Sequence, residues 1–211
     1  MRLILIRHGE TAWNAVRRYQ GHNPIPLNQR GRWQARQAGL RLGREAAAAL
    51  YASDIARAWE TATIIGALCH LAPAPLPDLR EIDDGQWAGL TPDELLERFP
   101  DHMAAVRQAP ATTVRLGGES YAQLQARTVR AFEDLAARHR GETVLAVSHG
   151  GAIRALICHL LGAPLEHFGR LWINNGALVE VSAHAEAGWR VLRVNDDAHL
   201  SDDRDAPASG E

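Results

Sequence analysis

Two short runs combine a histidine with glycine, and each follows an apolar stretch. Arg7-His8-Gly9-Glu10-Thr11 comes after apolar residues 3–6, and Ser148-His149-Gly150-Gly151 comes after residues 143–147. Each run places an imidazole where a predicted buried strand gives way to a turn. Ligands of open α/β sheets bind at the carboxyl ends of the strands. If the two strands are parallel neighbours, both imidazoles lie on one rim, and the arginine beside the first favours a phosphate over a metal ion.

His8 is surrounded by residues that suit a nucleophile. Arg7 places a permanent cation beside the imidazole, which disfavours its protonation and keeps a lone pair available. The planar guanidinium of Arg7 can also hold a phosphate, and Gly9 lets the backbone approach a ligand closely. The alternative is a structural histidine that bonds a backbone carbonyl.

His149 precedes a predicted helix over residues 152–161. Gly150 and Gly151 free the backbone there, and the first turn of a helix presents unpaired N–H groups that attract anions. A protonated His149 would stabilise negative charge on a phosphoryl oxygen. The alternative is a glycine-rich turn that contains an incidental histidine.

Arg57 lies in the first turn of a helix that Ser53 or Asp54 is expected to cap. It either forms a surface pair with Asp54, three residues earlier, or acts as a second phosphate clamp at a helix N-terminus. Taken alone, the spacing favours the surface pair.

Cleavage of a phosphate ester also needs a group that protonates the leaving oxygen. A partly buried carboxyl can do this near neutral pH. The acidic turn after residue 80 supplies Glu81, Asp83 and Asp84. The residues alone do not decide among these three.

The composition limits the class of protein that positions these groups. The chain has 211 residues, of which 46% are hydrophobic and 23% charged, enough for one buried domain and unlike a disordered protein. Its net charge of -2 gives no basic field for nucleic acid or an acidic membrane. With two cysteines and a short apolar run near residue 1, we expect a cytoplasmic protein without a membrane span.

Strand-like runs alternate with helical patterns, which predicts an α/β fold with a largely parallel sheet. Strands are predicted at residues 3–6, 50–52, 143–147, 177–182 and 189–194, and helices at 29–43, 55–65, 92–98, after 100, after 120 and at 152–161. Residues 10–28 are predicted as a loop and 72–77 as irregular or an extended edge. We expect a single domain over residues 1–200, with a lid-like insertion at about 82–118 and a disordered tail at 201–211. Pocket-shaping packing residues are expected in that insertion: Trp87, Leu95, Phe99 and Met103.

Four blocks of the chain occur in the order and spacing of one known family. They are Arg7-His8-Gly9-Glu10-Thr11; Ser53-Asp54 with Arg57-Ala58 and Thr61-Ala62; Leu79-x-Glu81 with Gly85-x-Trp87-x-Gly89; and Ser148-His149-Gly150-Gly151. From about residue 2 to residue 195 the chain resembles the histidine phosphatase superfamily, also called the phosphoglycerate mutase-like family. The resemblance implies a three-layer α/β/α sandwich with a mostly parallel central sheet. It also implies hydrolysis of a small phosphorylated metabolite through a phosphohistidine, with neither a metal nor another cofactor.

The same resemblance implies a role for each matching residue. His8 attacks phosphorus, while Arg7, Arg57 and His149 bind the phosphoryl group. Glu81 protonates the leaving oxygen and then activates the water that hydrolyses phospho-His8. Further residues are expected to line the phosphate or its entrance: Asn14, Gln20, Gly21 and Gly150.

Residues 18–22 and 117–120 resemble the broad-specificity phosphatases and the α-ribazole phosphatases of the family. Where the family often has an aspartate before Pro26-Leu27, this chain has Asn23-Pro24-Ile25, which leaves the shape of the entrance loop and the substrate open. Many members are dimers, so a homodimer is one expectation.

Three other functions are weighed against the phosphatase. A cofactor-dependent phosphoglycerate mutase typically has a longer stretch between the Glu81 and His149 blocks than this chain has. A catalytically inactive phosphate-binding module would normally have lost a core residue, and none is lost here. A metal hydrolase is disfavoured because the ten histidines show no HExxH spacing.

Overall fold

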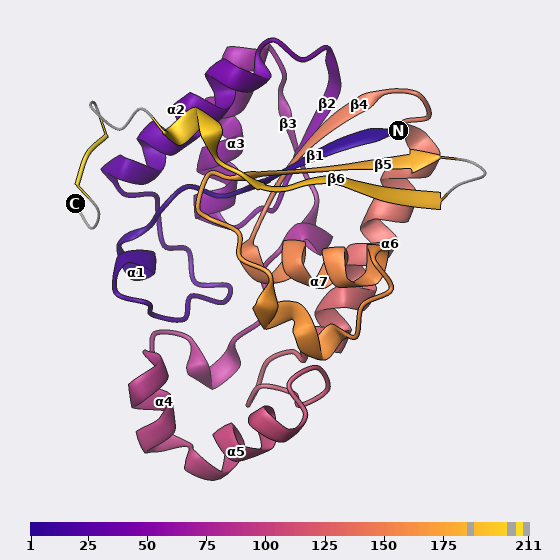
Figure 1. Cartoon of the computed structure of the whole chain (residues 1–211). Coiled ribbons are helices and arrows are strands. Elements are labelled where there is room, and N and C mark those ends of the chain that lie inside the picture. Colours follow the sequence, from indigo (N-terminus) through magenta and orange to yellow (C-terminus); the bar gives the residue numbers. More distant parts are fainter. Residues whose placement is uncertain (185–187, 202–205, 209–211) are drawn as a thin grey trace.

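The computed structural model of the chain describes residues 1–184, 188–201 and 206–208. Six strands form one sheet in the order β3-β2-β4-β1-β5-β6 (Figure 1). They are β1 (Arg2–Arg7), β2 (Ala47–Ala52), β3 (Pro73–Pro75), β4 (Thr143–Ser148), β5 (Leu178–His184) and β6 (Gly188–Asp196). The pairs β1–β4, β4–β2 and β2–β3 are parallel, whereas β5 is antiparallel to both β1 and β6. The mostly parallel sheet that the sequence predicts is confirmed.

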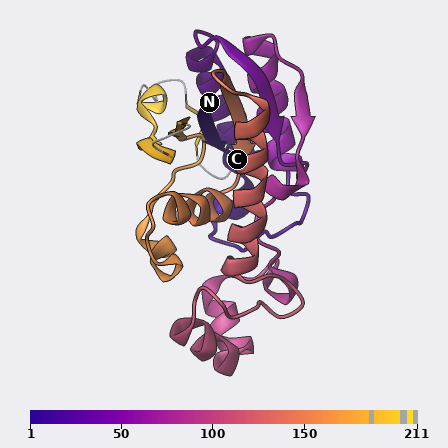
Figure 2. The same cartoon turned by 90° about the vertical axis from the view of Figure 1, so that its right-hand side faces the viewer.

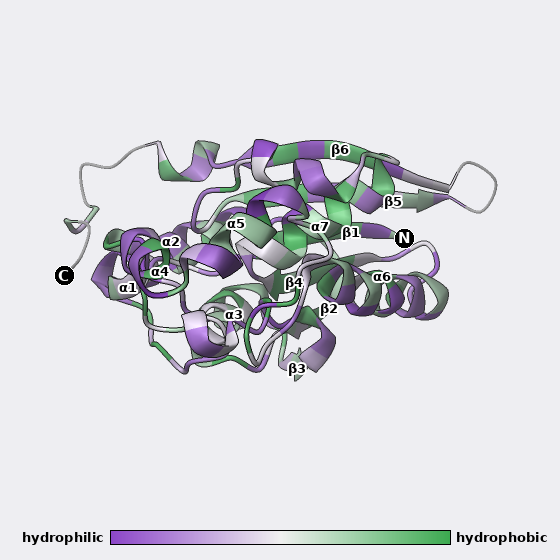
Figure 3. Cartoon of the chain, turned by 90° about the horizontal axis from the view of Figure 1, so that it is seen from below, coloured by the Kyte–Doolittle hydropathy of each residue, from purple (hydrophilic) through white to green (hydrophobic). Residues whose placement is uncertain are grey.

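Helices cover both faces of the sheet, which gives the expected three layers. Leu3 and Leu5 of β1 pack in one apolar cluster with α6 (Tyr121–Arg138) and α7 (Gly150–Leu160). Ile4 and Ile6 face the opposite way, into a cluster with α2 (Gln29–Leu42) and α3 (Ala56–Cys69). Successive side chains of a strand point to opposite faces, so a strand buried on both faces is apolar throughout. In Figure 3 green predominates around β1 and β4 in the middle of the molecule, whereas the edge strand β6 shows purple stretches among the green.

The register of the two central strands sets the position of the histidines. Arg7 at the end of β1 is opposite Ser148 at the end of β4. The backbone N–H of His8 donates to the Ser148 carbonyl at 2.9 Å, which extends the pairing one residue further. His8 and His149 therefore leave the sheet side by side, at the carboxyl ends of parallel neighbours.

Residues 82–118 project from this end of the sheet and form what we call the cap. The cap carries the 3₁₀ helix Gly85–Trp87 and the helices α4 (Pro92–Arg98) and α5 (Pro100–Gln108), at the bottom of Figures 1 and 2. Two backbone hydrogen bonds attach it to the loop after β1: Tyr19 N–H to Leu90 O at 2.9 Å, and Gly89 N–H to Tyr19 O at 2.8 Å. The cap is thus held beside the ends of β1 and β4.

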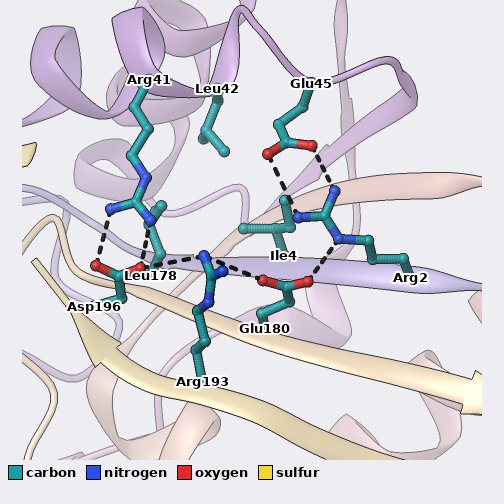
Figure 4. Close-up of a pocket in the computed structure, with 9 residues that line it drawn as sticks. All are labelled: Arg2, Ile4, Arg41, Leu42, Glu45, Leu178, Glu180, Arg193 and Asp196. Carbon is teal, nitrogen blue, oxygen red and sulfur yellow. Dashed lines mark hydrogen bonds and ion pairs between the residues drawn. The ribbon is translucent and has the colours of Figure 1, made fainter. Parts of the chain in front are cut away.

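A chain of alternating charges joins α2 to the strands at a small hollow away from the histidines (Figure 4). Arg2 on β1 bonds Glu180 on β5 at 2.6 Å, and Arg41 on α2 bonds Asp196 on β6 at 2.9 Å. The chain runs through these residues in order: Glu45, Arg2, Glu180, Arg193, Asp196 and Arg41. Because every one of these pairs is partly exposed, the network serves to fix α2 on the sheet more than to add large stability.

Several predicted element ends are wrong in detail. The predicted loop 10–28 contains a short helix, α1 (Ala12–Ala15), and α7 begins two residues earlier than expected, with His149 as its N-cap residue. Neither Ser53 nor Asp54 caps α3, whose N-cap residue is Ile55 and has no side-chain cap. The proline-rich segment, by contrast, forms the edge strand β3, which confirms the extended edge that was one of the two alternatives for residues 72–77.

The other predicted helices and strands are present with similar bounds. The expected disorder of the tail 201–211 concerns residues that lie largely outside the described ranges. Within the described ranges, no helix has the length and apolar character that crossing a membrane requires.

Candidate active site

The two histidines lie together on one rim, as predicted. Their ring centroids are 5.1 Å apart and the rings are inclined at 58°. His8 is 3% exposed and His149 is completely buried. Two imidazoles removed from water at the carboxyl ends of parallel strands form the centre of the site.

The hydrogen bonds of His8 determine which ring nitrogen carries the proton. Nδ1 lies 2.7 Å from the backbone oxygen of Gly9, and a carbonyl can only accept. Nδ1 is therefore the protonated nitrogen, and Nε2 holds the lone pair. The Nε–H of Arg57 donates to Nε2 at 3.2 Å. The nitrogen available for attack on phosphorus is thus Nε2.

The surroundings of His8 keep its ring neutral. Burial lowers the pKa of His8 well below 6.5, and the positive charges of Arg57 and then Arg7 lower it further. The sequence predicts this effect from Arg7, but burial and Arg57 both contribute more. A neutral imidazole at pH 7 is the form that can act as a nucleophile.

Arg57 is a buried member of the site, not a surface residue. It is 1% exposed, and its expected partner Asp54 instead bonds Arg80 at 2.6 Å. The Arg57 guanidinium donates to the backbone oxygens of Gly21 at 2.8 Å and Asn23 at 3.0 Å. The surface-pair interpretation is therefore wrong. The loop after α1 folds over Arg57 through backbone groups, so the family's aspartate is not needed for this contact.

Arg7 presents a buried donor that no described residue satisfies. Its Nη1 donates to the Ile173 oxygen at 2.6 Å, while its buried Nε has no partner among the described residues. Burial lowers the pKa of Arg7 to about 10, partly offset by the negative charge of Glu81, so Arg7 stays charged at neutral pH. A buried donor without a partner is costly and is the expected mark of a ligand site.

His149 has a similar unpartnered atom. Its Nε2 lies 2.8 Å from the hydroxyl of Ser53, and its buried Nδ1 has no partner among the described residues. Burial lowers the pKa of His149 well below 6.5, and Arg57 and His8 add to the effect. Burial and the nearby cation Arg57 thus both disfavour the protonated form of His149 that the sequence suggests.

Glu81 closes the site at the start of α7. Its Oε2 accepts the Gly151 N–H at 3.0 Å, and its Oε1 accepts the Ile82 N–H at 3.0 Å. A Cβ on Gly151 would lie 2.2 Å from Oε1, so only glycine allows this approach. The Gly151 N–H that the sequence predicts as free is thus occupied by the carboxyl group of Glu81.

The structure also separates the three candidate acids. Asp83 accepts the Gly85 N–H at 3.0 Å and does not line the cavity at the histidines. Asp84 does line it, but forms an ion pair with Arg115. Burial raises the pKa of Asp84 to about 6, against the opposing effect of Arg115. Glu81 is the acid that borders Arg7 and His8 without an arginine partner among the described residues.

The cavity at the histidines, which we call the phosphoryl cavity, has a volume of about 140 Å³. The expected entrance residues Asn14, Gln20 and Gly21 line it. Thr11 bonds the side chains of both Asn14 and Gln20 at 3.1 Å, and Gly21 has a φ of +48°. Gly150 lines the neighbouring cavity instead, where a Cβ would lie 3.2 Å from Nε of Arg7.

Two further cavities adjoin the phosphoryl cavity. The cap cavity, of about 240 Å³, lies between the cap and the domain and has Trp87 and Met103 in its wall. The Trp172 cavity, of about 200 Å³, lies on the other side of Arg7 and Glu81. Of the expected pocket-shaping residues, Leu95 is completely buried in packing, and neither Leu95 nor Phe99 lines the cap cavity.

Sequence reasoning missed residues that line the site from distant parts of the chain: Tyr19, Arg115, Tyr121 and Arg154. It also missed the bond of Ser53 to His149, although Ser53 belongs to a recognised block. Arg154 follows the second glycine of the His149 run by three residues, a spacing that places it one turn into α7. The other three become visible only when the cap is placed.

Among the described residues no group of three or more histidine, cysteine, aspartate or glutamate side chains could hold a metal ion. The charged residues that line the phosphoryl cavity include the arginines Arg7 and Arg57 and the acid Glu81. This arrangement suits a phosphoryl group, because planar guanidinium donors match phosphate oxygens.

Comparison with known proteins agrees with this chemistry. The profile of the histidine phosphatase superfamily, branch 1, matches residues 3–197. Phosphoserine phosphatase 1 of Hydrogenobacter thermophilus is 34% identical over 203 residues, which cover 96% of this chain and 95% of the relative. A metal-independent phosphoserine phosphatase of Arabidopsis thaliana is 37% identical over 202 residues, which cover 94% of this chain and 83% of the relative. The solved structure of Bacillus stearothermophilus YhfR superposes with a TM-score of 0.88 at 34% identity, covering 94% of this chain and 98% of that one.

Proposed function

This chain belongs to the histidine phosphatase superfamily and is a phosphomonoester hydrolase, and we propose that His8 carries the phosphoryl group between two half-reactions. The substrate is a small phosphorylated molecule that reaches the phosphoryl cavity through the entrance loop. Both relatives described above are named for phosphoserine, and hydrolysis is better supported than mutase activity.

In the first half-reaction, Nε2 of His8 attacks the phosphorus of the bound ester. A phosphoryl oxygen accepts a hydrogen bond from the unpartnered Nε–H of Arg7. Arg57 gives up its hydrogen bond to Nε2 of His8 and donates to the phosphoryl group instead. Formation of the P–N bond accompanies cleavage of the P–O bond to the alcohol. The protonated carboxyl of Glu81 gives its proton to the departing oxygen. The Nδ1–H bond to Gly9 keeps the phosphorylated ring in place.

In the second half-reaction, a water molecule attacks the phosphorus of phospho-His8. Glu81, now a carboxylate, accepts a proton from that water, and the P–N bond breaks to release inorganic phosphate and neutral His8. His149 acts as a neutral donor from Nδ1 if the Ser53 hydroxyl donates to its Nε2. This tautomer gives the buried Nδ1 a phosphoryl oxygen as its partner.

The observation that carries the proposal is the Nδ1–H bond to Gly9 together with the Arg57 contact at Nε2 of the same ring. The test is steady-state hydrolysis of 4-nitrophenyl phosphate by the wild-type protein and the His8→Asn variant. We expect the variant to lose at least about 10³-fold in kcat, as for removal of a covalent nucleophile. The matched control is His159→Asn, which changes an exposed histidine of α7 and should keep wild-type activity. Undiminished hydrolysis by His8→Asn would refute the role of His8.

A further inference from the structure

The cap cavity is one of the two cavities next to the phosphoryl cavity, and it shares the lining residues Tyr19, Arg115 and Arg154 with it. An ester whose phosphate lies against His8 can extend its alcohol part into this space. The walls of the cap cavity should therefore determine which alcohol part of a phosphomonoester is accepted. This inference rests on the proposed phosphatase function.

Donors and cations predominate among the polar groups of the cap cavity. The residues that line it include no carboxylate, so its wall has a positive charge. Trp87 is 2% exposed and lines the cavity, and its indole N–H has no partner among the described residues. A group bound here must therefore accept hydrogen bonds, and a negative charge on it would be favourable.

Arg115 is not the cation that binds such a group. It is 7% exposed, forms an ion pair with the buried Asp84 and stacks on Tyr19, Trp87 and Tyr121 at 4.8–5.6 Å from the ring centroids. Its charge is compensated by Asp84, and its position is fixed by the rings. Arg115 thus supports the wall of the cavity.

Arg154 differs because no carboxylate within the described ranges forms an ion pair with it. Its Nε donates to the Gly150 oxygen at 3.0 Å, one turn earlier in α7, and its guanidinium lies 5.6 Å from the ring centroid of Phe168. Arg154 lines the phosphoryl cavity, the cap cavity and the Trp172 cavity. Its charge is therefore available where the alcohol part of the ester must lie.

We propose that Arg154 is the residue that selects the substrate, by binding a carboxylate on the alcohol part of the phosphomonoester. The guanidinium fork suits a planar carboxylate, and the Phe168 ring and the Gly150 oxygen hold it in place. The enzyme then prefers phosphorylated hydroxy acids to otherwise similar esters that lack the carboxylate.

The test compares two matched esters, 3-phosphoglycerate and glycerol 3-phosphate, which differ in a carboxylate against a hydroxymethyl group. We expect wild-type kcat/KM to be about 10- to 100-fold higher for the carboxylate ester, the range for a charge-assisted hydrogen bond. Arg154→Met should remove this preference by lowering kcat/KM for 3-phosphoglycerate only, whereas Arg154→Lys should keep part of it. Arg107→Met, which changes an exposed arginine of α5, is the control and should keep the full preference.

A second measurement needs no variant, so it stands even if Arg154→Met does not fold. Glycerate should inhibit wild-type hydrolysis of 4-nitrophenyl phosphate competitively at concentrations at which glycerol does not. Equal kcat/KM for the two esters, or an equal loss for both in Arg154→Met, would overturn the role of Arg154 and leave the phosphatase intact. Absence of hydrolysis of all three esters would instead overturn the proposed function.

Discussion

Nε of Arg57 lies 3.2 Å from Nε2 of His8, so the guanidinium touches the nitrogen that attacks phosphorus in our proposal. The contact has two consequences. It keeps the pKa of His8 low, and it places a phosphate donor beside the nucleophile before substrate arrives. One arginine thus prepares the lone pair and is positioned to bind the group that the lone pair attacks.

Arg57→Lys should lower kcat/KM for 4-nitrophenyl phosphate by about 10²- to 10³-fold, the usual effect of losing one transition-state donor. Lysine keeps the charge but cannot contact His8, Gly21 and Asn23 with one planar group. Steady-state kinetics checks this, with Arg98→Lys on the exposed end of α4 as the control. Equal kcat/KM in Arg57→Lys and the wild type would contradict the role given to Arg57.

Glu81→Gln should affect esters according to their leaving groups. An alkyl ester needs a proton on its departing oxygen, whereas 4-nitrophenolate leaves without one. For glycerol 3-phosphate we expect kcat to fall by about 10²- to 10⁴-fold, the range for loss of a general acid. For 4-nitrophenyl phosphate we expect a much smaller fall in the rate at which phospho-His8 forms, measured as the initial burst of released 4-nitrophenolate. Equal losses for both esters would assign the proton to another group, such as Asp84, the other carboxyl group that lines the phosphoryl cavity.

Asp84→Asn should mainly lower the stability of the folded protein. The variant leaves Arg115 buried without its counter-charge, and losing one member of a buried pair costs about 3–5 kcal/mol. The free energy of unfolding, measured with urea, should fall by that order. Asp134→Asn on α6 is the control, because Asp134 is exposed. A change below about 0.5 kcal/mol, the usual size of a surface effect, would show that the pair is not compensating charge as we describe.

The two buried histidines should make the protein less stable in acid. The pKa values of both histidines in the folded protein lie well below the value of about 6.5 expected for the unfolded chain. At a pH between the folded and the unfolded pKa values, the unfolded chain therefore binds more protons than the folded protein. Stability is then complete above about pH 6.5 and falls as the pH drops toward the folded values, by up to about 1.4 kcal/mol per unit for each histidine.

Urea unfolding at pH 7.5 and pH 5.5 measures this dependence. His8→Asn should reduce the loss of stability between these pH values, whereas His159→Asn, at an exposed position, should not reduce it. Identical losses in His8→Asn and the wild type would mean that His8 does not stay neutral in the folded protein.

The central strands were predictable because their apolar runs have a simple cause. Residues 3–6 and 144–147 are buried on both faces, and such runs predict parallel strands in the middle of a sheet. A histidine follows each run two residues after its end, so the shared rim followed from the pairing of two parallel neighbours.

Arg57 was not predictable from its local pattern, and only the family resemblance placed it at the phosphoryl group. Its spacing to Asp54 suits a surface pair, and only the packing of loop 20–25 over α3 buries it. Asp84 and Arg115 are 31 residues apart, and their pairing depends on how the cap folds back. Local patterns carry no information on such contacts, because these depend on the placement of whole segments.

The most direct test of the account is to trap the phosphoenzyme. The wild-type protein is mixed with an excess of 4-nitrophenyl phosphate and quenched within one turnover in alkali, because phosphohistidine survives there. Peptide mass spectrometry then locates the phosphorylated residue. The account predicts one phosphoryl group on the peptide that contains His8, and its disappearance in His8→Asn. A phosphoryl group on another residue, or none during steady turnover of the wild type, would contradict it.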